Sequence, residues 1–155
     1  MLKKSLQSLY QYIKQEEYSG WDLFDGLNSK IFRHSFLYQS ELFRLAWIQF
    51  FKRSPVNFRK LALVPKDYNP KGLALFASGL LLVGEDDEAM KILDQLKGLA
   101  CSGYAGTSWG YNFDWQARAF YVLVGTPNMV TTVFVANAFL DYLAADERRL
   151  TKKNI

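Results

Sequence analysis

Apolar residues recur at helical spacing along most of the chain. Within residues 1–18 they fall on one face of a helix, at Leu2, Leu6, Leu9, Tyr10 and Ile13. A second helical pattern starts at Ser29 or Ser35 and continues to Lys52, just before Pro55. The pattern predicts an N-terminal amphipathic helix and one long helix before the proline.

Two later helix starts share the same capping chemistry. Asn69 precedes Pro70 and Thr126 precedes Pro127, and a proline at the first helical position has no N–H to leave unbonded. Each pair opens an apolar stretch. After acidic residues 85–88, the first stretch continues as a second amphipathic helix. We therefore expect successive copies of one helical hairpin.

The second hairpin lacks an apolar return helix. Asp146 and Glu147 indicate a break, and residues 146–155 are charged and rich in lysine. We expect a truncated tail there, which fits either a fragment of a longer protein or a short chain whose open face another subunit covers. An uncovered apolar face favours a homo-oligomer in both cases.

Composition places the chain among globular proteins. Its 155 residues are 50% apolar and 22% charged, which suits a single all-α domain over residues 1–155. The net charge of +4 comes largely from the chain ends and from residues 52–71. Such charges are typical of solvated surfaces, so we expect no nucleic-acid partner.

Several site and location classes are disfavoured. Cys101 and His34 are the single cysteine and histidine, which excludes a disulfide or a His/Cys zinc cluster within the chain. The glycines fit no phosphate loop or dinucleotide motif, so we expect no metal and no cofactor.

Apolar runs 73–83 and 129–140 fall short of the roughly 20 residues that span a bilayer, so we expect buried helices and a cytoplasmic protein.

An aromatic ladder near residue 110 is the main candidate for chemistry. Aromatic residues alternate with polar ones over 109–116, a pattern of extended backbone. Rings beside amide and carboxylate groups suit a saccharide site, in which Arg118 would pair with a uronate or phosphate. The candidate ligand-binding residues are Trp109, Tyr111, Asn112, Trp115, Gln116 and Arg118. Alternatively, the rings fill the core and Asp114 caps a helix that begins at Trp115.

Carboxylates could add acid and base groups. Glycoside hydrolysis uses two of them, about 5 to 10 Å apart, and Asp114 with Asp22 or Asp25 would supply such a pair if their loops converge. Turn formation and capping are the alternative roles. Further acid–base candidates are Tyr68, Tyr104 and His34, whereas Cys101 is expected to be a structural thiol.

Several motifs resemble a known family over residues 19–145. They are SGWD at 19–22, LNS at 27–29, AWIQ at 46–49, RSPVN at 53–57, YNPKGL at 68–73, WGYNFDWQ at 109–116 and GTP at 125–127. These motifs resemble the N-terminal part of proteins found with bacterial surface-polysaccharide biosynthesis. The resemblance implies helical hairpins that form part of an (α/α) toroid, the architecture of six-hairpin glycosidases, lyases and epimerases.

The resemblance supplies no catalytic motif, so it leaves open whether the chain is an enzyme. We expect a protein associated with polysaccharide biosynthesis that binds or modifies an oligosaccharide or polysaccharide, neutral or anionic, through the aromatic loop. The alternative is a non-enzymatic helical interaction module that oligomerises or packs on a partner.

Overall fold

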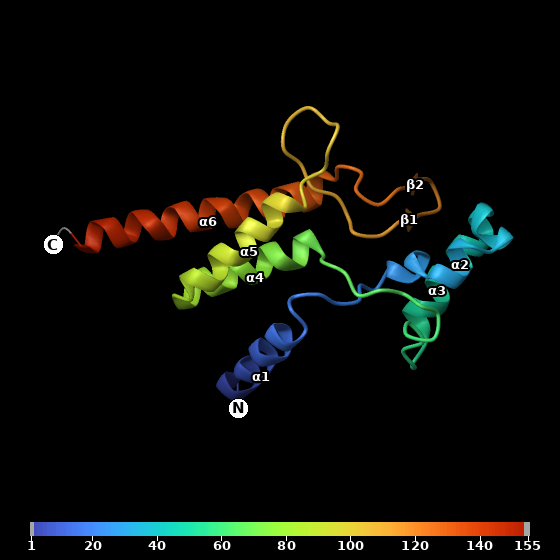
Figure 1. Cartoon of the computed structure of the whole chain (residues 1–155), viewed down its shortest axis with the longest axis horizontal. Helices are drawn as coiled ribbons and strands as arrows, with labels where there is room; N and C mark the ends of the chain where they lie inside the picture. The colour runs from blue at the N-terminus through green and yellow to red at the C-terminus, as the bar shows by residue number, and fades with distance from the viewer. Residues whose placement is uncertain (1, 154–155) are drawn as a thin grey trace. The chain divides into compact units, whose positions relative to one another are not determined.

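The computed structural model describes the backbone of residues 2–153 and the side chains of residues 7–147 (Figure 1). These residues are mainly helical with one small two-stranded sheet, which confirms the predicted helical class. The helical elements are α1 (Leu2–Gln15), η1 (Asp25–Asn28), α2 (Lys30–Arg33), η2 (Phe36–Gln39), α3 (Glu41–Arg53), α4 (Pro70–Val83), α5 (Asp86–Gly98) and α6 (Met129–Lys153). The strands are β1 (Trp115–Gln116) and β2 (Tyr121–Val122).

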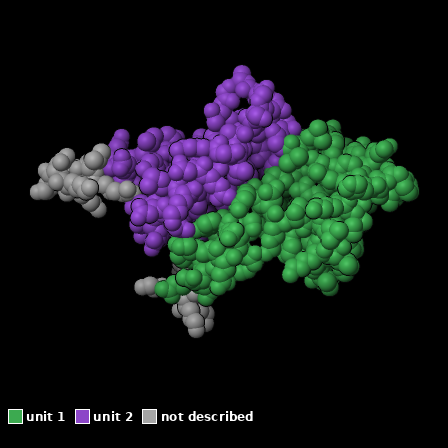
Figure 2. Space-filling view, in the orientation of Figure 1, with its two compact units in different colours: residues 1–69, 112–124 green, residues 70–111, 125–155 purple. Residues whose placement is uncertain are grey.

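Two compact units divide the chain, where the sequence predicted one domain (Figure 2). Unit 1 comprises residues 1–69 and 112–124, and unit 2 comprises residues 70–111 and 125–155. The chain thus returns to unit 1 for the short segment that carries the sheet. In that sheet β1 and β2 are antiparallel, with Trp115 opposite Val122 and Gln116 opposite Tyr121.

Aromatic packing dominates the core of unit 1. Leu27, Phe32 and Ile48 are buried together, and the ring of Trp47 stacks on that of Phe32 with 4.7 Å between centroids. A second buried cluster, of Phe51, Ala62 and Val64, also contacts Trp47. This tryptophan therefore links both clusters.

The long helix predicted before Pro55 is wrong in its first half, because serines divide it. Ser29 accepts the Phe32 N–H at 3.1 Å and donates to the Ala62 carbonyl at 2.6 Å, which starts α2. Ser35 and Ser40 both have extended backbones. Serine hydroxyls compete with helical hydrogen bonds, so the chain forms α2, η2 and α3 in succession.

Unit 2 is built on three helices, with α4 packed against both α5 and α6 (Figure 1). Pro70 begins α4, as the sequence predicted. The start of α6 differs: Asn128, rather than Thr126, accepts the Thr131 N–H through its side chain, at 3.1 Å. Small and branched residues fill the buried helix faces, including Ala74, Ala77, Ile92, Leu96, Val135 and Ala138.

The break predicted at Asp146 and Glu147 is wrong. Helix α6 continues to Lys153, because neither glycine nor proline interrupts the run and acidic residues are compatible with a helix interior. By length and composition, residues Met129–Glu147 of α6 could cross a bilayer. Core helices of soluble proteins share that composition, so the prediction that no segment spans a membrane stays a prediction.

Candidate functional site

The aromatic ladder is divided between the two units. Residues 109–111 belong to unit 2, and residues 112–118 belong to unit 1. Extended backbone was expected over 109–116, and within that range Gly110 forms an isolated bridge with Pro127 and Trp115–Gln116 form strand β1. The predicted helix at Trp115, with Asp114 as its cap, is therefore wrong.

Trp109 is a core residue of unit 2. It is 6% exposed, its Nε1 donates to the Leu96 carbonyl at 2.6 Å, and its ring packs near Phe139 at 6.2 Å. Its backbone N–H donates to Thr132 Oγ1 at 3.0 Å. This burial leaves the ring little open face for a sugar. Tyr111 is half-buried, and its carbonyl accepts the Gly125 N–H at 3.1 Å.

Asp114 is 3% exposed and accepts hydrogen bonds from several groups of unit 1. The Val124 N–H donates to Oδ1 at 2.7 Å, and Arg33 Nη2 donates to Oδ2 at 2.8 Å. The hydroxyls of Tyr38 and Tyr121 also donate to Oδ2, and they lie 2.7 Å from each other. The carboxylate thus joins the hairpin segment to η2 and to the end of α2.

The two tyrosines are held in their protonated form. Burial raises the pKa of Tyr38, and its hydrogen bond to the Asp114 carboxylate raises it further. Burial also raises the pKa of Tyr121, with a further contribution from the negative charge of Asp114. Both hydroxyls therefore act as donors to the carboxylate, which indicates a structural cluster.

Asp22 and Asp25 belong to a separate network around Arg59. Arg59 Nε donates to Asp25 Oδ1 at 2.8 Å, and its Nη2 donates to the Asp22 carbonyl. Burial raises the pKa of Asp25 although the Arg59 guanidinium opposes that shift. Asp22 Oδ1 accepts the Phe24 N–H at 3.0 Å and Oδ2 accepts from Asn69 Nδ2 at 2.8 Å. The bond from the Phe24 N–H to Asp22 is the turn role that the sequence left open, whereas Asp25 is held by its ion pair with Arg59.

A groove of about 480 Å³ lies in unit 1, between α3 and the β1–β2 hairpin. It is lined by Phe24, which precedes η1, by Leu42, Leu45, Ala46, Ile48, Gln49 and Arg53 of α3, and by Trp115, Gln116, Ala117 and Arg118 of the hairpin. Three predicted ligand-binding residues, Trp115, Gln116 and Arg118, therefore share one concave surface. None of the three candidate aspartates lines it.

The three hairpin residues differ in what they offer to a ligand. Trp115 is half-buried, with its ring perpendicular to that of Phe120 at 5.2 Å between centroids. Gln116 is buried: Oε1 accepts from Arg44 at 2.8 Å, and Nε2 donates to the carbonyls of Ala117 and Phe120. Gln116 therefore stabilises the turn between β1 and β2, and the exposed residue Arg118 lies in that turn.

Known proteins provide no match to this chain: it matches no protein-family model, no curated protein and no solved structure. Among the residues that the structure describes, His, Cys, Asp and Glu side chains form no group of three that could hold a metal ion.

The ligand-binding candidate Asn112, the acid–base candidates His34, Tyr68 and Tyr104, and the thiol of Cys101 lie outside the groove lining. The Asn112 carbonyl accepts from Asn28 Nδ2 at 2.9 Å, and its buried Oδ1 has no hydrogen-bond partner among the described residues. Exposed His34 has Nδ1 2.6 Å from the Lys30 carbonyl. The remaining candidates are half-buried Tyr68, exposed Tyr104 and half-buried Cys101.

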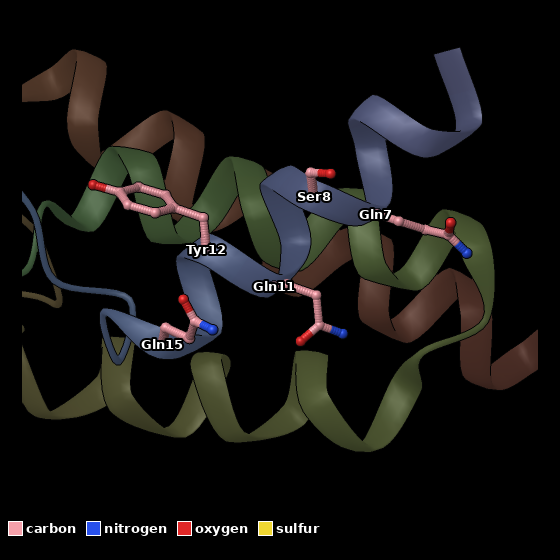
Figure 3. A pocket seen from close by; sticks show the side chains of 5 residues that line it. All are labelled: Gln7, Ser8, Gln11, Tyr12 and Gln15. Carbon is pink, nitrogen blue, oxygen red and sulfur yellow. The ribbon is translucent and has the colours of Figure 1, made fainter. Parts of the chain in front are cut away.

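A second hollow is lined by side chains of α1 alone (Figure 3). The residues are Gln7, Ser8, Gln11, Tyr12 and Gln15. Side chains of a single helix cannot surround a ligand, and none of these is charged. The groove on α3 is therefore the stronger candidate site.

Sequence reasoning missed the α3 side of the groove as a lining surface. It noted Arg53 only as one of the basic residues of 52–71, which were interpreted as a solvated surface. Leu42, Ala46, Gln49 and Arg53 follow each other at steps of four, three and four residues, which places them on one helix face. That face carries both apolar and polar side chains, and this mixed pattern can be recognised in the sequence. Its position opposite the hairpin, however, depends on tertiary packing.

Proposed function

We propose that unit 1 binds saccharide in the groove between α3 and the β1–β2 hairpin, as part of a protein associated with polysaccharide biosynthesis. The observation that carries this proposal is the position of Trp115, a partly exposed ring in a concave surface that also holds amide and guanidinium groups. Pockets for small ligands combine an apolar lining with a few convergent polar groups. Saccharides present an apolar ring face and a polar rim, which match this combination.

Trp115 would supply the stacking surface. Its perpendicular contact with Phe120 restricts the orientation of its ring, and the Gln116 hydrogen bonds hold the turn beside it. A fixed ring loses little conformational entropy when a ligand binds. On the α3 side, exposed Gln49 can donate to or accept from sugar hydroxyls.

The aspartates are proposed to position the site. Asp114 and Asp25 are each 3% exposed, and each already accepts a hydrogen bond from an arginine. Neither carboxylate opens to the groove, so binding is better supported than hydrolysis. Asp114 would hold the segment that carries Trp115 in place.

The proposed architecture is part of an (α/α) toroid. The antiparallel pair α4 and α5 is the kind of hairpin from which such rings are built, and α6 would be the first helix of another hairpin. The motifs at residues 19–145 support this interpretation through the family that they resemble.

Calorimetry with Trp115→Ala tests saccharide binding. Cellohexaose and a hexamer of galacturonate serve as neutral and anionic probes. If Trp115 stacks on the sugar, the variant should lose about tenfold in affinity, equivalent to about 1.4 kcal/mol. Phe36→Ala is the control, because this aromatic residue of unit 1 is 82% exposed and does not line the groove. Folded wild-type protein that binds neither probe would refute the proposal.

A second candidate function, the helical interaction module, is favoured by an exposed stripe on α6. Met129, Val133, Leu140 and Leu143 are 80%, 50%, 60% and 57% exposed. With Ala136 they follow steps of four and three residues, the spacing of a helix-pairing seam. We propose that this stripe pairs subunits of a homo-oligomer.

Light scattering tests the oligomer. The wild-type chain should have at least twice the monomer mass, and Leu140→Glu should reduce it to the monomer. Lys91→Glu, at an exposed position of α5, should leave the mass unchanged. A monomeric wild-type chain at micromolar concentration would contradict this second candidate.

A further inference from the structure

Two arginines of the groove have no partner, unlike the other arginines of unit 1. Arg33 is paired with Asp114, Arg59 with Asp25, and Arg44 with Gln116. Among the described residues, the side chains of Arg53 and Arg118 form no ion pair and no hydrogen bond, and both line the groove. No groove-lining residue is acidic. The two guanidinium groups are thus the exceptions among the arginines of unit 1.

Helix electrostatics explain only one of these exceptions. Arg53 is the last residue of α3, where a cation interacts favourably with the helix dipole. Arg118 lies in the turn between β1 and β2, where no such helix end attracts it. Both side chains are exposed, and an anion bound in the groove that they line would interact favourably with both charges.

A third cation adds to the positive potential. Lys52 Nζ lies 4.9 Å from the ring centroid of Phe24, and Phe24 lines the same groove. Guanidinium groups bind carboxylates and phosphates through two parallel N–H donors, with more directional preference than an ammonium group has. The cations thus favour an oxyanion as ligand.

The rest of the lining indicates what carries the anion. Leu42, Leu45 and Ile48 make an apolar wall on α3, and Trp115 adds a ring on the hairpin side. Gln49 precedes Arg53 by four residues, so an amide and a guanidinium lie side by side on one helix face. A single acidic sugar residue carries an apolar ring face, hydroxyls and an oxyanion, which correspond to the ring, the amide and the guanidinium groups of the lining.

We infer that the groove selects a saccharide with an acidic residue, whose carboxylate or phosphate binds between Arg53 and Arg118. The inference rests on the proposed saccharide-binding function and names its ligand class. Trp115 contacts the sugar ring, Gln49 contacts a hydroxyl, and the two arginines contact the anion.

The experiment compares affinities by calorimetry at low ionic strength. The probes are a galacturonate hexamer, cellohexaose, glucose 6-phosphate and a single-stranded oligonucleotide. The variants are Arg53→Gln, Arg118→Gln and the double variant. Lys60→Gln is the charge-matched control, because Lys60 is exposed in unit 1 and does not line the groove. Circular dichroism of each variant verifies that the helices are intact.

We expect at least one acidic sugar to bind tenfold more tightly than cellohexaose. Each arginine variant should lose about tenfold in affinity for it, with cellohexaose affinity and the Lys60→Gln variant within twofold of wild type. Comparison of galacturonate with glucose 6-phosphate shows whether the anion is a carboxylate or a phosphate ester.

Three results would overturn the inference, and they are distinguishable from one another. Equal affinities for cellohexaose and both acidic sugars would remove the anion preference while leaving saccharide binding intact. Tighter binding of the oligonucleotide than of any sugar would assign the arginines to nucleic acid. Absence of binding to every probe would remove both the inference and the saccharide function on which it rests.

Discussion

Replacing Asp114 with alanine tests whether this carboxylate is a structural centre of unit 1. The substitution removes the acceptor of the Val124 N–H, of Arg33 and of two tyrosine hydroxyls from a residue that is 3% exposed. Hydrogen bonds to charged groups contribute about 1.5–3 kcal/mol each when a buried partner is left unsatisfied.

Not all of that free energy is lost. The Arg33 side chain is 39% exposed and can turn to water, so its contribution is small. Tyr38 and Tyr121 can still bond to each other across 2.7 Å. The Val124 N–H and one hydroxyl then remain without their acceptor. We therefore expect a loss of about 3–4 kcal/mol in the free energy of unfolding, and about 2 kcal/mol for Asp114→Asn, which keeps one acceptor oxygen.

Urea unfolding followed by tryptophan emission is the assay. Trp21, Trp47 and Trp115 belong to unit 1, whereas Trp109 belongs to unit 2, so the signal reports mainly on the unit that contains Asp114. With a slope of about 2 kcal/mol per molar urea, the alanine variant should shift the midpoint by about 1.5–2 M. Lys60→Ala is the control, because Lys60 is an exposed residue of the same unit and should change stability by less than about 0.5 kcal/mol.

A destabilisation of unit 1 by less than about 1 kcal/mol in Asp114→Ala would refute this structural role, because surface substitutions usually change stability by about 0.5 kcal/mol or less. Asp114→Asn also tests whether the carboxylate matters for the proposed binding. If this variant remains folded but no longer binds either saccharide probe, the carboxylate holds the segment that carries Trp115 in its binding position or contacts the ligand itself.

Two further predictions concern a close backbone contact and alkaline pH. Gly110→Ala should destabilise unit 2 by more than about 2 kcal/mol, because its Cβ would lie 2.2 Å from the Thr126 carbonyl oxygen. Gly79→Ala, in α4 with no atom within 4 Å, should stabilise it by about 0.5–1 kcal/mol, and thermal unfolding compares the two. The raised pKa values of Tyr38 and Tyr121 favour their protonated forms in the folded state. Stability is therefore fully present below the ordinary tyrosine pKa of about 10 and falls as the pH rises above it, a loss that Tyr38→Phe should reduce. Equal pH dependence of wild type and variant in urea midpoints above pH 10 would contradict this prediction.

Local signals determined much of the helical framework from sequence alone. Apolar spacing predicted α1, and Asn69 before Pro70 predicted the start of α4. Such signals act between residues within about four positions, so they depend little on the rest of the chain. The serines that divide the segment before Pro55 were also visible, but their effect depended on a hydrogen bond from Ser29 to Ala62, 33 residues away.

The aromatic ladder shows where sequence alone was insufficient. Its alternation identified Trp115 and Gln116, which line the groove. It gave Trp109 the same role, although that ring is buried in unit 2. Periodicity describes how side chains alternate along a backbone, not which core each side chain enters. The division at residues 111 and 112 decided that difference.

The sequence by itself determined the helical class, several helix boundaries and the residue types capable of saccharide recognition. Tertiary structure decided which of those residues share a site. Arg33 pairs with Asp114 across 81 positions and Arg59 with Asp25 across 34. Partners at such separation meet only when the chain between them has folded, because local propensity carries no information about contacts at that range. Packing therefore pairs Asp114 and Asp25 with arginines, whereas the side chains of Arg53 and Arg118 line the groove without a partner among the described residues.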